Sequence, residues 1–277
     1  MTRNDNRRRQ GGLSTGARTA LLTAGLIAAL GGVPAQAAEP GASTLSAYDA
    51  YLNKAIAALD SGVARKDILW ANDSPQRLGR LQAGEVIAEP WGAEPIVAID
   101  GGEISDVIGA VMIPGKSLDQ VLALMQDYNS YAKTFAPEIA ASKLLAREGD
   151  RFQVAVKLVK KIVIAIGFQL EQTTNFTKVS PTQWQSRGHS TRLTELKGVG
   201  TAAEAELSAA ENHGYLWRAF TLDNFEQVDG GVIVESRTVS LSAPLPPALR
   251  WMASTLGKLP QQSMTNKLEA VRKALRP

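Results

Sequence analysis

The chain contains no cysteine and only two histidines, His189 and His213. The absence of cysteine excludes disulfide bonds, thiolate nucleophiles and iron–sulfur clusters, and the shortage of histidine excludes zinc sites that need several imidazole ligands. Neither histidine has a partner at metal-ligand spacing, because His189 lies in a strand-like segment and His213 lies in a turn. The sequence therefore predicts no metal and no other cofactor.

Concentrated basic charge is also missing once the N-terminal segment is set apart. The whole chain has 30 basic and 27 acidic residues, but residues 1–37 hold five arginines and one aspartate, which leaves 25 basic and 26 acidic residues beyond them. No predicted element carries the stripe of lysine and arginine that binds a phosphate backbone, so a nucleic-acid partner is not expected. The composition, 44% hydrophobic and 21% charged over 277 residues, is typical of a globular protein with a sizeable core.

The first 37 residues have the three parts of a secretory signal peptide. Five arginines precede an uncharged apolar run from Ala20 to Val33, and Ala35-Gln36-Ala37 supplies the small residues of a cleavage site. The apolar run of about 14 residues is shorter than the roughly 20 that a membrane-spanning helix needs, so no stable membrane span is expected. We predict cleavage near Ala37 and export to a periplasm or out of the cell.

The mature chain is predicted to open with one amphipathic helix. Apolar residues recur at helical spacing from Leu45 to Leu59, and the pattern ends at Gly62. We therefore divide the chain into a signal peptide at 1–37, an N-terminal helix with its connector at 38–84, and a main domain at 85–277.

The main domain changes its hydrophobic period along its length. Short strand-like segments precede a helix that begins after Ser117, where Gln120 completes a capping box. From residue 142 to 242 the period is two and turn residues interrupt it, which predicts about four to six antiparallel strands. Residues 248–275 return to the helical period, with Gly257 and Pro260 expected to kink or break the helix.

The stretches Gly214–Arg218, Val228–Val232 and Ser240–Ser242, with the prolines that precede the last helix, carry a family resemblance. Together with the order of elements, they resemble the START and polyketide-cyclase-like (SRPBCC) superfamily of helix-grip proteins over about residues 85–275. The resemblance implies an α+β fold in which a curved antiparallel sheet wraps around a long C-terminal helix, here with an extra N-terminal helix. It also implies an internal cavity for lipids or other apolar small molecules.

Asp229-Gly230 predicts a two-residue hairpin turn, which sets Phe225 opposite Val234 and Asp223 opposite Ser236. Residues on this face of the hairpin are expected to point inward. They form the candidate ligand-binding wall: Tyr215, Trp217, Thr221, Asp223, Phe225, Val232, Val234, Ser236 and Thr238. The opposite, outward face carries Arg218, Glu226, Glu235 and Arg237. Asp223 is then a lone inward carboxylate, which is costly unless it is hydrogen-bonded.

Three functions remain open. The leading interpretation is an exported protein that binds or carries a lipid-like or other apolar small molecule without chemistry. One alternative is a cyclase- or hydrolase-type enzyme in the same cavity, with Asp223, Tyr215, His189 and Arg192 as its catalytic candidates. The other alternative is a ligand-free envelope scaffold that uses helix 45–59 as a docking element. The sequence sets neither the ligand nor the oligomeric state.

Overall fold

The computed structural model describes residues 39–161, 165–247 and 253–276. The predicted signal peptide and the first residues of the predicted C-terminal helix, 248–252, lie outside the described residues. Within the described ranges, no helix combines the length and the apolar character that a membrane span requires.

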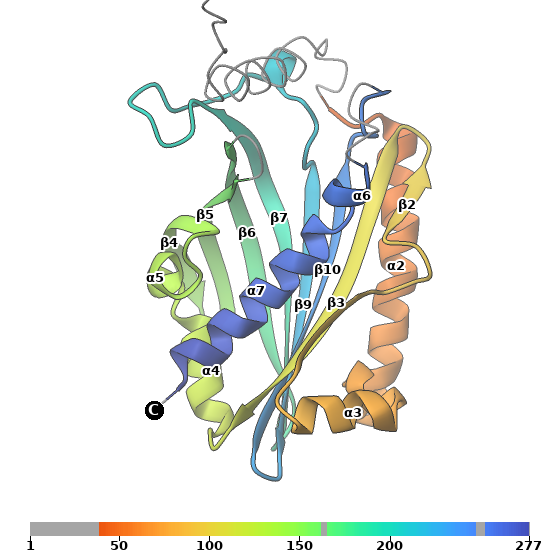
Figure 1. Cartoon of the computed structure of the whole chain (residues 1–277), viewed down its shortest axis with the longest axis vertical. Coiled ribbons are helices and arrows are strands. Elements are labelled where there is room, and N and C mark those ends of the chain that lie inside the picture. The colour runs from red at the N-terminus through yellow and green to blue at the C-terminus, as the bar shows by residue number, and fades with distance from the viewer. Residues whose placement is uncertain (1–38, 162–164, 248–252, 277) are drawn as a thin grey trace, which may run out of the picture. The chain divides into compact units, whose positions relative to one another are not determined.

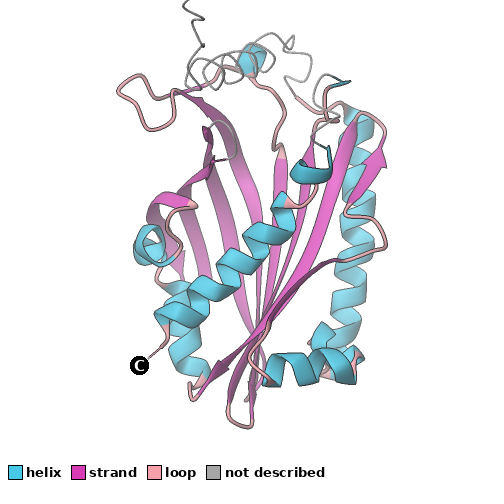
Figure 2. Cartoon of the chain, in the orientation of Figure 1, coloured by secondary structure: helices cyan, strands magenta, loops and turns pink. Residues whose placement is uncertain are grey.

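One antiparallel sheet of ten strands runs through the described part of the chain (Figures 1 and 2). Its order is β1-β3-β10-β9-β7-β6-β5-β4, while β2 pairs with β3 and β8 pairs with β7. The strands are β1 (Val86–Pro90), β2 (Ile96–Ile99), β3 (Gly102–Pro114), β4 (Ile139–Glu148), β5 (Arg151–Lys161), β6 (Ala165–Ser180), β7 (Gln183–Lys197), β8 (Ala205–Glu206), β9 (Arg218–Val228) and β10 (Gly231–Ser242). The predicted α+β arrangement of an antiparallel sheet with a long C-terminal helix is confirmed.

The helices begin and end largely where the sequence signals lie. They are α2 (Ala42–Arg65), η1 (Trp70–Asp73), α3 (Pro75–Gln82), α4 (Leu118–Gln126), η2 (Tyr128–Ser130), α5 (Tyr131–Thr134), η3 (Ala209–Glu211), α6 (Ala253–Leu256) and α7 (Leu259–Ala274). Both hydrogen bonds of the capping box between Ser117 and Gln120 are present. The stripe that follows is divided among α4, η2 and α5, and the last helix is broken between α6 and α7, near Gly257 as expected.

Helix α7 packs on one face of the sheet, which we call the inner face. Met264 and Leu268 of α7 join Phe225, Val232 and Val234 in one buried cluster. Figure 1 shows α7 crossing in front of the strands. Helix α7 can approach β3 closely because Gly109 of β3 lies beneath the helix and has no side chain.

The N-terminal segment covers the opposite, outer face. Tyr48 of α2 packs with Leu222 and Val239, and Ile68, beside η1, belongs to the same buried cluster as Ile233. The apolar side of α2 is therefore used inside the molecule, which removes the basis for treating helix 45–59 as a free docking element.

The β9–β10 hairpin has the predicted register, with Phe225 opposite Val234 and Asp223 opposite Ser236. The expectation that its other face is exposed is wrong, because Arg237 is only 2% exposed. The Arg237 guanidinium donates two hydrogen bonds to the Asp106 carboxylate, with Nε–Oδ1 at 2.8 Å and Nη2–Oδ2 at 2.6 Å. This ion pair lies under the cover of the N-terminal segment and satisfies a charge that burial would otherwise penalise.

Glu235, also 2% exposed, binds η1 to the outer face through hydrogen bonds. Its carboxylate accepts hydrogen bonds from the backbone N–H groups of Trp70 and Ala71, at 3.1 and 3.2 Å, and from Asn224 Nδ2 at 3.1 Å. Burial nevertheless raises the pKa of Glu235 to about 7, because these hydrogen bonds and the nearby Arg77 only partly offset the loss of water.

A side chain at Gly109 is expected to push α7 away from β3. An added Cβ would lie 2.8 Å from Leu268 Cδ1, 2.8 Å from Met264 Cγ and 2.6 Å from the Ile87 carbonyl oxygen. We expect Gly109→Ala to lower the free energy of unfolding by about 1–3 kcal/mol. Gly79→Ala in α3, where nothing lies within 4 Å, is the matched control and should raise it by about 0.5–1 kcal/mol. Urea denaturation measures both, and unchanged stability of Gly109→Ala would contradict the packing.

Glu235 should give the protein a pH-dependent stability. Its raised pKa means that the folded state binds a proton more tightly than the unfolded state, so the free energy of unfolding falls as pH rises from about 4.5 to 7. The loss attributable to this residue is about 3 kcal/mol. Glu235→Gln should remove that part of the slope in urea denaturation at several pH values, whereas Glu148→Gln, on an exposed residue of β4, should keep it. A full slope in Glu235→Gln would refute this assignment.

Candidate functional site

Asp223 of β9 is the centre of a polar cluster on the inner face. Ser236 Oγ donates a hydrogen bond to Asp223 Oδ1 at 2.6 Å, and Ser186 Oγ donates to Oδ2 at 3.3 Å. Lys267 Nζ, from α7, lies 2.6 Å from Asp223 Oδ1 and 2.7 Å from Ser236 Oγ. We call Asp223, Ser186, Ser236 and Lys267 the polar cluster; it links α7 to the middle of the sheet.

Asp223 is, as expected, an inward carboxylate that accepts a hydrogen bond, and Lys267 adds an ion pair that the sequence analysis did not identify. Its side chain is 11% exposed and that of Lys267 is 27% exposed, so the two charges compensate each other where little water reaches them. A sequence signal for Lys267 existed, because it falls on the same helical stripe as Met264, Leu268 and Val271, all of which are buried. A lysine in that stripe must find a partner on the sheet.

Two tyrosines, one buried and one half-buried, lie near the cluster, and the sequence analysis did not single them out. The rings of Tyr128 and Tyr131 are 4.8 Å apart. Burial raises the pKa of both hydroxyls, and the negative charge of Asp223 raises it further. Tyr131 donates its hydrogen bond to the Met125 carbonyl oxygen at 2.6 Å, and Tyr128 shares one with Thr174. Both hydroxyls thus stay neutral at ordinary pH and serve as hydrogen-bonding groups.

Small and polar residues continue from the cluster across four neighbouring strands. We call this set the polar band: Thr174 on β6, Ser186 and Gly188 on β7, Thr221 and Asp223 on β9, and Ser236 and Thr238 on β10. Toward the β9–β10 turn it is bordered on β6 and β9 by the buried side chains of Phe176 and Phe225, and on β5 the buried Phe152 lies opposite Thr174. Toward the other end of the sheet it is bordered by the buried side chains of Val156, Phe168 and Leu170. The inner face is thus apolar, then polar, then apolar along its strands.

The hairpin places seven of the predicted wall residues on the inner face: Thr221, Asp223, Phe225, Val232, Val234, Ser236 and Thr238. Trp217 instead belongs to the outer cluster around Tyr48, because β9 begins only at Arg218 and the alternation of faces does not extend to residue 217. Tyr215 also precedes the strand, and its ring stacks on His213 with centroids 5.1 Å apart.

Loop residues 213–215 are held by a buried carboxylate that the sequence analysis did not identify. Glu195, 2% exposed, accepts hydrogen bonds from the backbone N–H groups of His213 and Tyr215 at 3.1 and 2.8 Å. Its Oε2 also lies 2.9 Å from His213 Nδ1. Glu195 therefore fixes the path of the chain into β9.

The four catalytic candidates are not brought together. His189 is exposed on β7, next to the inward Gly188 and so on the opposite side of the strand. Arg192 forms ion pairs with Glu206 and Glu171. Only Asp223 of the four lies in the polar cluster, so the titrating group that an enzyme needs is not assembled from these residues.

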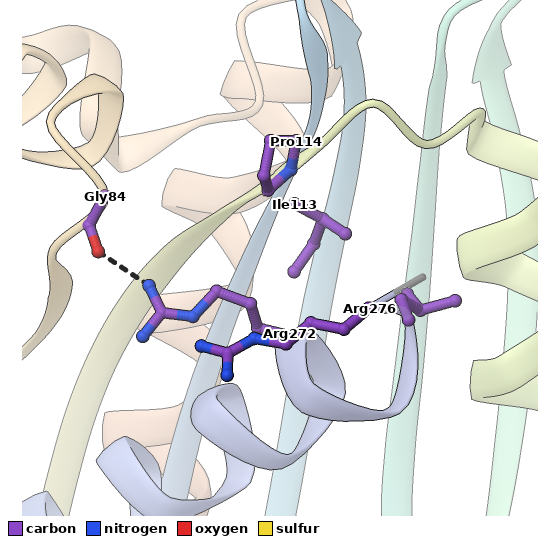
Figure 3. A pocket seen from close by; sticks show the side chains of 6 residues that line it. Gly84, Ile113, Pro114, Arg272 and Arg276 are labelled. Carbon is purple, nitrogen blue, oxygen red and sulfur yellow. Dashed lines mark hydrogen bonds between the residues drawn. The ribbon is translucent and has the colours of Figure 1, made fainter.

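A separate surface hollow lies at the C-terminal end of α7 (Figure 3). It has a volume of about 260 Å³ and is lined by Gly84, Ile113, Pro114, Arg272, Leu275 and Arg276. Arg272 Nη1 donates a hydrogen bond to the Gly84 carbonyl oxygen at 2.6 Å. None of the residues of the polar cluster lines this hollow. In the part of the chain that the structure describes, no group of three or more acidic or histidine side chains is placed to hold a metal ion.

No protein-family model matches the chain, and no curated protein matches it. Solved structures do. A fragment of a STAR-related lipid transfer protein from Xanthomonas axonopodis is 15% identical over 68% of this chain and 100% of its own, with a TM-score of 0.46. The Zhui aromatase/cyclase from Streptomyces sp. R1128 is 12% identical over 62% of this chain and 93% of its own, with a TM-score of 0.40.

The lipid transfer and protein localization domain of human StarD13 is 8% identical over 76% of this chain and 98% of its own, with a TM-score of 0.41. At these identities and scores the likenesses carry no conclusion about function. The helix-grip arrangement expected from the sequence, an antiparallel sheet with α7 packed on its inner face, is shown by the strand order and the core of this chain.

Proposed function

We propose that the protein is an exported carrier that binds a lipid-like or other apolar small molecule between the inner face and α7. The observation that carries this proposal is the polar band, whose small side chains interrupt an otherwise apolar, buried surface. Ligand sites are typically apolar surfaces with a few placed polar groups, and this inner face has that composition.

The ion pair between Asp223 and Lys267 orders the polar band. Replacing a buried ion pair with well-packed apolar residues is often neutral or stabilising, so such a pair contributes little to stability alone. Here it also orders Ser236, which contacts both charged groups. A hydroxyl or carbonyl group on an otherwise apolar ligand would find donors and acceptors already oriented at this point.

Apolar ligands should bind to the purified protein. Native mass spectrometry after mild purification should reveal a bound mass, and fluorescent fatty acids or sterols should titrate saturably. Thr221→Phe, which fills the polar band, should weaken that binding by about tenfold or more, equivalent to roughly 1.4 kcal/mol. Thr177→Phe, at an exposed residue of β6, is the matched control.

Asp223→Asn distinguishes binding from catalysis in the same assay. The substitution keeps the shape of the side chain but leaves Lys267 without its counter-charge, so apolar affinity should stay within a few fold while the free energy of unfolding falls by about 3 kcal/mol. Absence of any bound mass and of saturable uptake would refute the carrier function. An activity abolished in Asp223→Asn with binding intact would replace the carrier by an enzyme.

Export is the second part of the proposal and rests on the arginine-rich, apolar and Ala35-Gln36-Ala37 segments of the N-terminus. When the full chain is expressed in an exporting bacterium, N-terminal sequencing of the exported protein should read Ala38-Glu39. An exported protein that retains Met1 would contradict the proposed cleavage.

A further inference from the structure

The sheet divides between β7 and β9. These strands pair only from Gln183 opposite Glu226 to His189 opposite Phe220. Beyond that point β7 continues beside β6 and β8, whereas the chain before β9 runs along the end of β10, where Trp217 N donates to the Leu241 carbonyl oxygen at 2.7 Å. The two strands thus separate while each keeps a different neighbour.

A hollow of about 370 Å³ lies at this division, and we call it the slot. Its lining includes Glu39, Leu45, Leu193, Thr194, Trp217 and Arg218. Leu45 belongs to α2 and Trp217 packs in the outer cluster, so one side of the slot lies at the outer face.

A bulge in β7 brings an inner-face residue into the same slot. Between Ser190 and Arg192 the pairing with β6 shifts by one residue, which changes the face to which each later side chain points. Leu193 consequently lies opposite the buried Leu170, on the inner face, and Thr194 lies opposite Gln169, on the outer face. The slot is therefore lined from both faces of the sheet.

The two arginines of the slot differ in their ion pairs. Arg192 is paired with Glu206 and Glu171. Arg218 forms no ion pair with any described residue, and its Nη1 donates only to the neighbouring Trp217 carbonyl oxygen, at 2.8 Å. An exposed guanidinium beside the apolar Leu193 is suited to a carboxylate that carries an apolar chain.

Helix α7 is held over the inner face by polar contacts with Glu138 and with Lys160 of β5. These contacts favour an entrance for the ligand elsewhere than beneath α7. Asn266 Nδ2 donates to Glu138 Oε1 at 2.7 Å, and Lys160 contacts both Glu138 and Ser263. Entry beneath α7 would break these contacts as well as the ion pair of Lys267, whereas the slot is a hollow that already exists where β7 and β9 separate.

We propose that the slot is the entrance to the inner-face site for single-chain carboxylate amphiphiles such as fatty acids. Arg218 binds the carboxylate at the outer side, and the chain passes Leu193 toward Leu170 and Phe168. This inference rests on the proposed carrier function and adds to it the class of ligand and the position of the headgroup.

Thiol protection tests the entrance directly, because the chain has no cysteine of its own. Thr194→Cys places a single thiol in the slot, and Thr177→Cys is the matched control on an exposed part of β6. Saturation with cis-parinaric acid, followed by its fluorescence, should slow maleimide labelling of Thr194→Cys at least fivefold and leave Thr177→Cys unchanged. Unchanged labelling of Thr194→Cys while the acid is bound would refute the entrance.

The position of the ligand's carboxylate is tested by two substitutions in the slot, one that removes a positive charge and one that removes a negative charge. Arg218→Gln should raise the Kd for cis-parinaric acid by about threefold to tenfold, as expected for one exposed ionic contact, and should leave the Kd for its methyl ester unchanged. Glu39→Gln should leave the Kd for the acid unchanged or lower it. If Arg218→Gln changed the Kd for the acid and the Kd for the ester by the same factor, the role of Arg218 would be refuted. If the acid does not bind to the unmodified protein, this inference fails, whereas saturable binding of sterols would still support the carrier function.

Discussion

Burial of β3, β9 and β10 on both faces of the sheet is the constraint on which the rest of this structure depends. Helix α7 covers the inner face and the α2–α3 segment covers the outer face, so polar side chains in the middle of the sheet have little access to water. Each buried charge therefore needs a partner supplied by another element. Asp106 supplies it for Arg237, the backbone of η1 for Glu235, and Lys267 of α7 for Asp223.

The same constraint shapes the candidate site. Because α7 provides both apolar side chains and Lys267, it packs closely where β3 has Gly109 and forms an ion pair where β9 has Asp223. Between these two contacts lies the polar band, whose small residues leave their hydrogen-bonding groups turned toward α7. The proposed carrier site and its proposed entrance lie in different parts of the sheet. The polar band is in the part where β7 and β9 are paired, and the slot is where these two strands separate.

Much of the fold is predictable because its signals are local. The hairpin register follows from the Asp229-Gly230 turn, the start of α4 from the capping box at Ser117, and the break before α7 from the region of Gly257. Burial of the outer face was not predictable in this way. In the sequence, the residues of this face are a mixture of apolar and charged side chains. Glu235 and Arg237 are buried only because the N-terminal segment, more than a hundred residues earlier in the chain, packs over them.

By itself, the sequence determined the main helices, the hairpin pairing and the inward direction of Asp223, because periodicity and turn chemistry act over a few residues. It did not determine η1 and α3, which lie in the stretch taken as a connector. Only the tertiary structure decided the partners of the Asp223 carboxylate, since Lys267 reaches it from a helix whose position on the sheet depends on many distant contacts. It also decided the place of Trp217, which alternation assigned to the inner face. The strand begins one residue later than that assignment required, and the packing of α2 on the outer face buries the indole there.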